Sequence, residues 1–288
     1  MIRASQPLFP ALPLDRACAL LDVSRSELYR ERPQDAPSAP ETALVAAIEA
    51  VVLEWPAYGY RRVTAALQRD GWEVNHKRVL RLMRAQGWLC QRRRRWAPTT
   101  QSGHGLAVYP NLLADRGWRR LTAVNQAWLA DLTYIRLPQG FCYLAAILDA
   151  YSRRVVGWSL AETLDASIAV AALEQALAER CPPPGWVHHS DRGVQYACDE
   201  YVTRVLDAGG RPSMTAVASP RENAPAESFM RTLKHEEVYL QEYRDFAEAR
   251  AALGPFIEEV YNQKRLHSSL GYRPPREFEE LLTAGILR

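Results

Sequence analysis

Three carboxylates in the chain have the type and spacing for phosphoryl-transfer chemistry, provided that the fold brings them together. Asp131 lies in the apolar run WLADLTYI, Asp191 follows the run WVHHS, and Glu227 lies in a helical pattern. Carboxylates gathered in one place raise one another's pKa unless cations neutralise them. Oxygen ligands in that number suit Mg²⁺ or Mn²⁺, and two such ions can activate a water or a 3′-hydroxyl for displacement at phosphorus.

The stretch WVHHSDRGVQY around Asp191 raises two other kinds of site. A zinc site would need further Cys or His ligands at short spacings, and the sequence has none. A serine hydrolase would need an oxyanion loop and an ordered base for Ser190, which the sequence does not supply. We therefore expect His188 and His189 to be strand residues that flank Asp191, with His189 and Arg192 as candidate phosphate contacts.

The elements that position these acids follow from the hydrophobic pattern after residue 119. They are strands at 127–137, 141–151 and 153–163, a helix at 165–180, a strand that ends at Asp191, a helix at 196–210, a strand from 211 and a helix at 223–239. This order predicts an α/β fold with a mixed five-stranded sheet and helices on both faces. The three acids converge if the first and fourth strands are neighbours. Strand alternation alone would instead turn Asp131 toward water.

Small all-α regions precede the sheet. Residues 14–31 predict a helix-turn-helix with Ser24 as an N-cap, and a plain helical hairpin is the alternative because only Arg25 and Arg30 offer phosphate contacts. A Pro-rich linker follows, and then a helical pattern begins at Glu41. Two further helices end in Gly, as C-caps do, and Asn75 is the expected N-cap of the second.

The basic residues of the chain are concentrated in this helical region. Residues 58–96 contain eleven Lys or Arg and two acids, a local net charge of +9 in a chain whose total is +3. Four of these cations, Lys77, Arg78, Arg81 and Arg84, share one helix face. The alternative is an ordinary solvated face, but the scarcity of acids removes salt-bridge partners, whereas contacts with a phosphate backbone require this bias.

Composition and cysteine usage limit the class of protein. The chain has 288 residues, of which 48% are hydrophobic and 24% charged, so it can bury a substantial core. Its five cysteines are scattered and are expected to be reduced thiols. Neither a secretory leader nor an 18-residue apolar run is present, so we expect a cytoplasmic protein with no membrane partner, associated with the nucleoid when bound to DNA.

Six phrases in order extend the argument from spacing to family: YGYRRV, VNHKRVLRLM, WLADLTYI, HSDRGVQY, NAPAESFMRTLKHE and YNQKRLHSSLGYRPP. The phrases lie between residues 58 and 275, and the resemblance as a whole covers roughly residues 14–278. The chain resembles the OrfB-type transposases of insertion sequences, and 59 residues between Asp131 and Asp191 and 35 between Asp191 and Glu227 resemble the DDE spacing of retroviral integrases.

The resemblance implies an RNase H-like catalytic core that cuts element ends and transfers the liberated 3′-hydroxyl. It implies that Asp131, Asp191 and Glu227 are the catalytic acids and the ligands of two Mg²⁺ or Mn²⁺ ions. Asn223 and Lys234 share a helix face with Glu227, and we assign them to DNA or substrate positioning. Glu222 departs from the family, which usually has Asp at this position.

We expect DNA contacts from twelve residues: Arg61, Arg62, Lys77, Arg78, Arg81, Arg84, Arg92, Arg93, Arg94, Arg95, Asn223 and Lys234. We expect four parts: a helix-turn-helix-like segment at 1–33, a basic helical DNA-binding region at 34–105, the integrase core at 106–240 and a helical tail at 241–288. The tail is expected to pack near the active site, with Lys264, Arg265 and His267 approaching DNA, or else to be a structural cap.

The expected partner is double-stranded DNA, both element ends and target. The family also implies a homo-oligomer on DNA and, as a fusion or a partner, the product of an upstream reading frame, since no sustained heptad occurs in this chain. Two other functions remain open at this point. One is a regulatory protein that binds the ends without turnover, and the other is a general RNase H-like nuclease, which would not need the basic helices.

Overall fold

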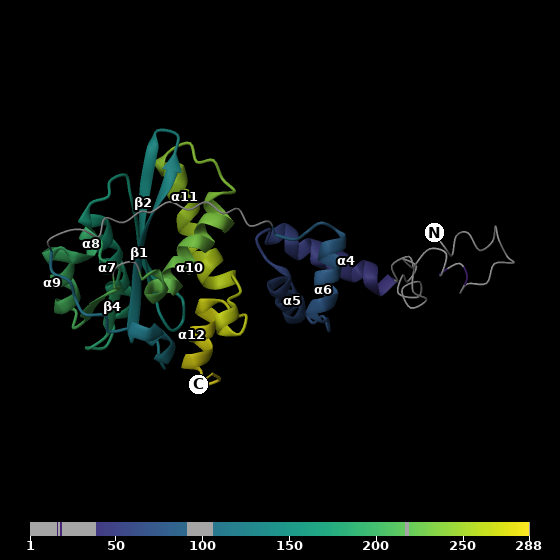
Figure 1. The fold of residues 1–288 in the computed structure, drawn as a ribbon, viewed down its shortest axis with the longest axis horizontal. Helices are drawn as coiled ribbons and strands as arrows, with labels where there is room; N and C mark the ends of the chain where they lie inside the picture. The colour runs from purple at the N-terminus through teal and green to yellow at the C-terminus, as the bar shows by residue number, and fades with distance from the viewer. Residues whose placement is uncertain (1–15, 17, 19–38, 91–105, 217–218, 288) are drawn as a thin grey trace.

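The computed structural model describes residues 16, 18, 39–90, 106–216 and 219–287. The expected first helix-turn-helix, with Ser24, Arg25 and Arg30, and the cluster Arg92–Arg95 lie outside these residues. In Figure 1 helices pack against a sheet, and α10 (Ala224–Leu233) and α12 (Pro275–Thr283) lie between this sheet and the helices of residues 39–85. None of the described helices is long and apolar enough to cross a membrane.

Five strands form one mixed sheet in the order β3-β2-β1-β4-β5. The strands are β1 (Ala127–Leu137), β2 (Gly140–Asp149), β3 (Val155–Ala161), β4 (Val187–Ser190) and β5 (Arg211–Met214). β1, β2 and β3 pair antiparallel, whereas β4 pairs parallel with both β1 and β5. The predicted mixed sheet is confirmed, and so is the adjacency of the first and fourth strands.

The short strand β4 leaves the later part of β1 without a partner strand on one side. β4 pairs with β1 only over Ala127 to Leu129, while β1 itself continues to Leu137. Beyond Leu129, β1 therefore has no partner strand on this side. Asp131 lies at this point, and Asp191 directly follows the last residue of β4.

Helices cover both faces of the sheet. One face carries α7 (Ala166–Arg180), α8 (Val194–Ala197) and α9 (Asp199–Asp207). The other carries α10 (Ala224–Leu233), the π-helical turn η3 (Lys234–Val238), α11 (Phe246–Pro255) and the π-helical segment η4 (Phe256–Lys264). α7 approaches β3 closely at Gly157, because a Cβ there would lie 2.2 Å from the carbonyl oxygen of Ala172.

The basic region folds as three helices around a hydrophobic core that also includes Leu266 of the C-terminal segment. They are α4 (Ala39–Glu54), α5 (Tyr60–Arg69) and α6 (His76–Ala85). Asn75 is the predicted N-cap of α6, because its side chain accepts a hydrogen bond of 2.8 Å from the backbone N–H of Lys77. Gly71 and Gly87 adopt positive φ angles after α5 and α6, as predicted for C-terminal glycines.

The residues after 240 belong to the same core as the sheet. Leu253, Phe256, Ile257 and Tyr261 pack with Phe229 of α10 beneath β1 and β2. The 3₁₀ turn η5 (Ser268–Leu270) and helix α12 (Pro275–Thr283) follow, and a second 3₁₀ segment, η1 (Ala114–Arg120), precedes β1. The C-terminal part is therefore helical, as predicted, but it is a structural layer of the core and not an appendage.

Candidate active site and nucleic-acid surface

Asp131 stands half-buried on β1, where β4 no longer covers the strand. The backbone N–H of Leu132 donates a hydrogen bond of 2.9 Å to its Oδ1. Burial and the negative charges of Asp191 and Glu227 raise the pKa of Asp131 to about 8, against the opposing effects of the Leu132 N–H and Lys234. Asp131 therefore lies in the electrostatic field of both other predicted acids.

Asp191 follows β4 and is held by a turn. The N–H of Gly193 donates a hydrogen bond of 2.9 Å to Oδ1 of Asp191. A Cβ on Gly193 would lie 3.0 Å from the same oxygen, so the glycine leaves the carboxylate room. Asp191 is half-buried, which leaves its side chain open to solvent on one side.

Glu227 lies in the first turn of α10, which packs against β1. Its side chain is half-buried. Burial raises its pKa, Arg231 on the same helix lowers it, and the charge of Asp191 raises it again. The fold thus brings the three predicted acids, on β1, directly after β4 and in α10, close enough for Asp191 and Glu227 to raise the pKa of Asp131 and for Asp191 to raise that of Glu227.

The three carboxylates offer hard oxygen ligands of the kind that Mg²⁺ and Mn²⁺ prefer. Their mutual repulsion fits a site that is completed by a divalent cation, since cations favour the charged form of a carboxylate. Among the described residues, no three His, Cys, Asp or Glu side chains lie close enough to enclose one metal ion. The three carboxylates therefore do not form a closed cage around one ion.

Asn223 was expected to contact DNA, but the structure buries this residue. Its side chain is only 3% exposed, and its Nδ2 donates a hydrogen bond of 2.9 Å to the carbonyl oxygen of Ala130. The residue precedes α10 and points into the sheet, so its amide joins the start of that helix to the strand beside Asp131. Its Oδ1 has no hydrogen-bond partner within the described part of the chain.

Lys234 lies at the end of α10, beside an aromatic residue that the sequence argument did not single out. Its Nζ lies 4.6 Å from the ring centroid of Tyr134, close enough for a cation–π contact. Burial lowers the pKa of Lys234, and the charge of Asp131 opposes this shift.

The two histidines of β4 are buried strand residues, as predicted. Nε2 of His188 lies 2.8 Å from the hydroxyl of Tyr201, and Nδ1 of His189 lies 2.8 Å from the hydroxyl of Ser213. Burial lowers the pKa of His188 to about 3 and that of His189 to about 4, so both are neutral. Because His189 is 0% exposed, the idea that it contacts phosphate is wrong.

Helix α6 carries the predicted cations on its surface. Lys77, Arg78, Arg81 and Arg84 are all exposed. Arg81 forms a salt bridge of 2.6 Å with Glu41 at the start of α4, so the acid missing from the basic stretch comes from outside it. The remaining cations of this face are available for phosphate contacts.

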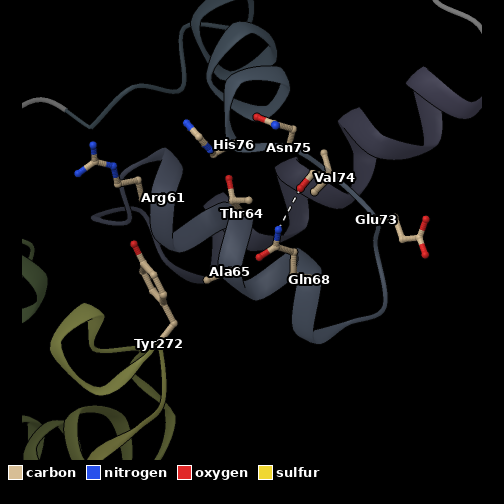
Figure 2. A pocket seen from close by; sticks show the side chains of 9 residues that line it. All are labelled: Arg61, Thr64, Ala65, Gln68, Glu73, Val74, Asn75, His76 and Tyr272. Atoms are coloured by element: carbon tan, nitrogen blue, oxygen red, sulfur yellow. Dashed lines mark hydrogen bonds between the residues drawn. The ribbon is translucent and has the colours of Figure 1, made fainter.

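A groove of about 670 Å³ lies between α5 and α6 (Figure 2). Arg61, Asn75 and His76 line it from the two helices, and Tyr272 lies across from them on the C-terminal segment. Arg61 is exposed at this groove. Arg62 is not: its Nε donates a hydrogen bond of 3.1 Å to the carbonyl oxygen of Leu266, so a predicted DNA contact holds the C-terminal segment instead.

The C-terminal phrase YNQKRLHSSLGYRPP does not place its cations as expected. Arg265 and His267 are buried, with 3% and 7% of their surfaces exposed, and only Lys264 is exposed. Both nitrogens of the Arg265 fork that face Glu236 lie 2.6 Å from its carboxylate oxygens. The expectation that Arg265 and His267 approach DNA is wrong, because these side chains pack inside the protein.

Known families and proteins resemble this chain along most of its length. Two integrase core domain models match residues 122–220 and 208–275, and a helix-turn-helix-like domain model matches residues 40–96. The insertion element IS600 uncharacterized 31 kDa protein of Shigella sonnei is 35% identical over 266 residues, which is 91% of this chain and 97% of that protein.

Two further likenesses concern a named transposase and a solved fold. The transposase InsF for insertion sequence IS3A of Escherichia coli (strain K12) is 36% identical over 77% of this chain and 76% of that protein. The catalytic core domain of BIV integrase aligns with 57% of this chain and 99% of its own at 17% identity, with a TM-score of 0.42. By its identity to these relatives over nearly its whole length, the chain belongs to the OrfB-type transposases of insertion sequences, which have an integrase-like core.

Proposed function

We propose that this transposase cuts the ends of its own insertion sequence and joins them to new DNA with Asp131, Asp191 and Glu227 as its catalytic acids. The observation that carries the proposal is the placement of three half-buried carboxylates: Asp131 lies on β1 beyond its pairing with β4, Asp191 directly follows β4, and Glu227 lies in the first turn of α10. Together with burial, the charges of Asp191 and Glu227 raise the pKa of Asp131 to about 8. Such an arrangement is costly in an apoprotein and is explained by a cation that it binds.

The proposed cofactor is Mg²⁺ or Mn²⁺, two ions to a site, with the three carboxylates as ligands. Bound there, the cations supply the positive charge that activates a water or a 3′-hydroxyl and stabilises the leaving oxygen. The protein orients the ligands: the Leu132 N–H holds Asp131, and the Gly193 N–H holds Asp191. Asn223 ties the start of α10, and with it Glu227, to β1.

The basic helices are proposed to hold duplex DNA while the carboxylates act on it. The exposed cations of α6 suit contacts with the phosphate backbone, which position a protein without reading sequence. We propose the DNA-contacting set Arg61, Lys77, Arg78, Arg81, Arg84, Arg92, Arg93, Arg94, Arg95 and Lys234. The division into parts at 1–33, 34–105, 106–240 and 241–288 and assembly as a homo-oligomer on DNA, alone or with the product of an upstream reading frame, belong to the same proposal.

The test is a cleavage and joining assay on labelled DNA that carries the ends of the element. Wild type and Asp191→Asn are compared in Mg²⁺ and in EDTA, with and without the upstream partner segment. We expect nicked and joined products from wild type in Mg²⁺ alone. If both proteins bind the DNA equally and neither cuts it, with the partner segment supplied, the protein is a regulator of the ends and the proposal fails.

A further inference from the structure

Arg265 forms a buried salt bridge with Glu236, which lies just after α10, the helix that carries Glu227. Its Nε and Nη2 each lie 2.6 Å from a carboxylate oxygen of Glu236, and the two side chains are only 3% and 11% exposed. A buried ion pair of this kind is weak evidence for stability, because desolvation can cost as much as the attraction returns. A role in fixing local geometry therefore explains this buried pair better than a contribution to stability does.

The pair joins two π-helical turns. Glu236 lies in η3, which begins at Lys234 and closes with a hydrogen bond of 2.8 Å from the N–H of Tyr239 to the carbonyl of Lys234. Arg265 caps η4, where its own N–H donates to the carbonyl of Val260 at 2.8 Å. π-turns inside helices are rare and are frequent at functional sites. The π-turn to which the Arg265 guanidinium binds is thus the turn that positions Lys234 beside the ring of Tyr134.

The residue after Arg265 is held from the other side by the basic helices. The N–H of Leu266 donates a hydrogen bond of 2.8 Å to the hydroxyl of Tyr58, which is 2% exposed. The carbonyl of Leu266 accepts the bond of 3.1 Å from Arg62 on α5. Farther along, Glu277 of α12 pairs with Arg69 of α5 at 2.6 Å. Residues 265–266 therefore contact both the basic region around α5 and the π-turn η3, which directly follows the helix that carries Glu227.

We propose that Arg265 is a positioning residue for the DNA-cutting reaction: its fork on Glu236 fixes the π-turn that holds Lys234 against Tyr134, at the side of Asp131. The inference rests on the proposed function. A bidentate guanidinium fits this role, because its planar fork sets direction as well as charge, which an ammonium cannot do. Arg265 touches neither DNA nor metal in this scheme and acts through Glu236 and Lys234.

The experiment is a double-mutant cycle in the full chain between Arg265→Lys and Lys234→Gln. The readout is the single-turnover cleavage rate at saturating DNA, with DNA affinity and Tm measured on every variant. In the wild-type background we expect Arg265→Lys to slow cleavage about tenfold with little change in affinity, since small misplacements at an active site cost rate. In the Lys234→Gln background it should slow cleavage less than about twofold, because the two residues act in series.

Two results would overturn the inference. One is an unchanged rate for Arg265→Lys, and the other is the same loss in both backgrounds, which is what a general structural role produces. If Arg265→Lys melts below the assay temperature, the near-isosteric Glu236→Gln takes its place in the cycle and the same criteria apply. A wild type that does not cut refutes the proposed function itself, whereas a wild type that cuts beside an unaffected Arg265→Lys refutes this inference alone.

Discussion

Two carboxylate clusters lie near β1 and β2, and the protein compensates their negative charge to different degrees. The open cluster consists of Asp131, Asp191 and Glu227, all half-buried. The closed cluster consists of Asp149 and Glu279, with 0% and 11% of their side chains exposed. Both clusters place negative charge inside the protein, but the surrounding groups compensate that charge to different degrees.

The closed cluster is surrounded by donors. Arg180 lies 2.6 Å from Oε1 of Glu279, Arg154 lies 2.9 Å from Oε2, and the Ser152 hydroxyl donates at 2.6 Å. Burial raises the pKa of Asp149 in this cluster, but the pKa of Glu279 is held below its usual value by Arg180, Ser152 and Arg154, although burial acts to raise it too. The cluster joins α12 to the end of β2 and to α7, so its charges serve the fold.

In the open cluster Lys234 acts to lower the pKa of Asp131 and Arg231 that of Glu227, yet burial and the neighbouring acids still raise the pKa of Asp131 to about 8. The cluster's two named backbone donors, the N–H groups of Leu132 and Gly193, orient carboxylates without supplying a full positive charge. The difference between the clusters teaches that burial alone does not mark a functional carboxylate. We propose that the carboxylates whose charge the protein compensates less are the ones that bind a cation.

The largest expected effect is on catalysis at the open cluster. Asp131→Asn should reduce cleavage and joining by at least about a thousandfold, since loss of a single essential catalytic acid costs this much or more. It should not lower the free energy of unfolding of the metal-free protein, because it removes a repelled charge. Single-turnover assays and thermal unfolding check both parts, and a large loss of Tm would contradict the comparison.

The closed cluster should show the opposite pattern. Glu279→Gln leaves Arg180 and Arg154 without their shared counter-ion and should lower the free energy of unfolding by about 3 kcal/mol. Cleavage should persist at temperatures where the variant stays folded. Glu280→Gln is the matched control, because Glu280 is 66% exposed and its pair with Arg276 should be worth only about 0.5 kcal/mol. Equal Tm losses in both variants would remove the distinction.

A pH dependence separates the clusters further. The pKa of Asp131 is raised from 3.8 to about 8, so between these values the folded state holds a proton that the unfolded state has lost. Stability of the metal-free wild type should therefore fall as pH rises through this window, and Asp131→Asn should not show this fall. The Tm of both proteins in EDTA from pH 5 to about 8 tests the sign, and a constant difference would refute it.

The smallest expected effects are on DNA binding by the cations of α6, of which Arg81 forms a salt bridge with Glu41. Arg78→Gln should weaken binding to any duplex DNA and reduce the slope of log affinity against log salt by about one. Arg81→Gln should do less, because Arg81 is already engaged by Glu41 at 2.6 Å. Affinities measured across a salt series decide this, and a larger loss for Arg81→Gln would show that the Glu41 pair does not occupy it.

The sequence predicted the sheet well because its signals are local. The strand at 127–137 is found with these bounds, and the Asn75 cap and the two glycines that end α5 and α6 are where turn chemistry predicts them. The convergence of Asp131 and Asp191 followed from one topological condition, the adjacency of the first and fourth strands. That condition is met.

What the sequence did not predict depends on long-range pairing. Arg62, Arg265 and Asn223 were expected at DNA because they are polar and lie in family phrases, yet each finds a partner inside the protein. Their partners lie between 29 and 204 residues away in the chain. Neither composition nor periodicity encodes such a pairing, so a polar residue in a motif is equally compatible with a buried joint and with a ligand contact.

The most direct test of the account is to measure Mn²⁺ binding to the full-length protein at pH 8, using water proton relaxation as the readout. Wild type is compared with Asp191→Asn from the open cluster and Glu279→Gln from the closed cluster, at a temperature where all three are folded. The account predicts that wild type and Glu279→Gln bind Mn²⁺ alike and that Asp191→Asn loses the binding. Equal binding by Asp191→Asn and wild type would contradict it.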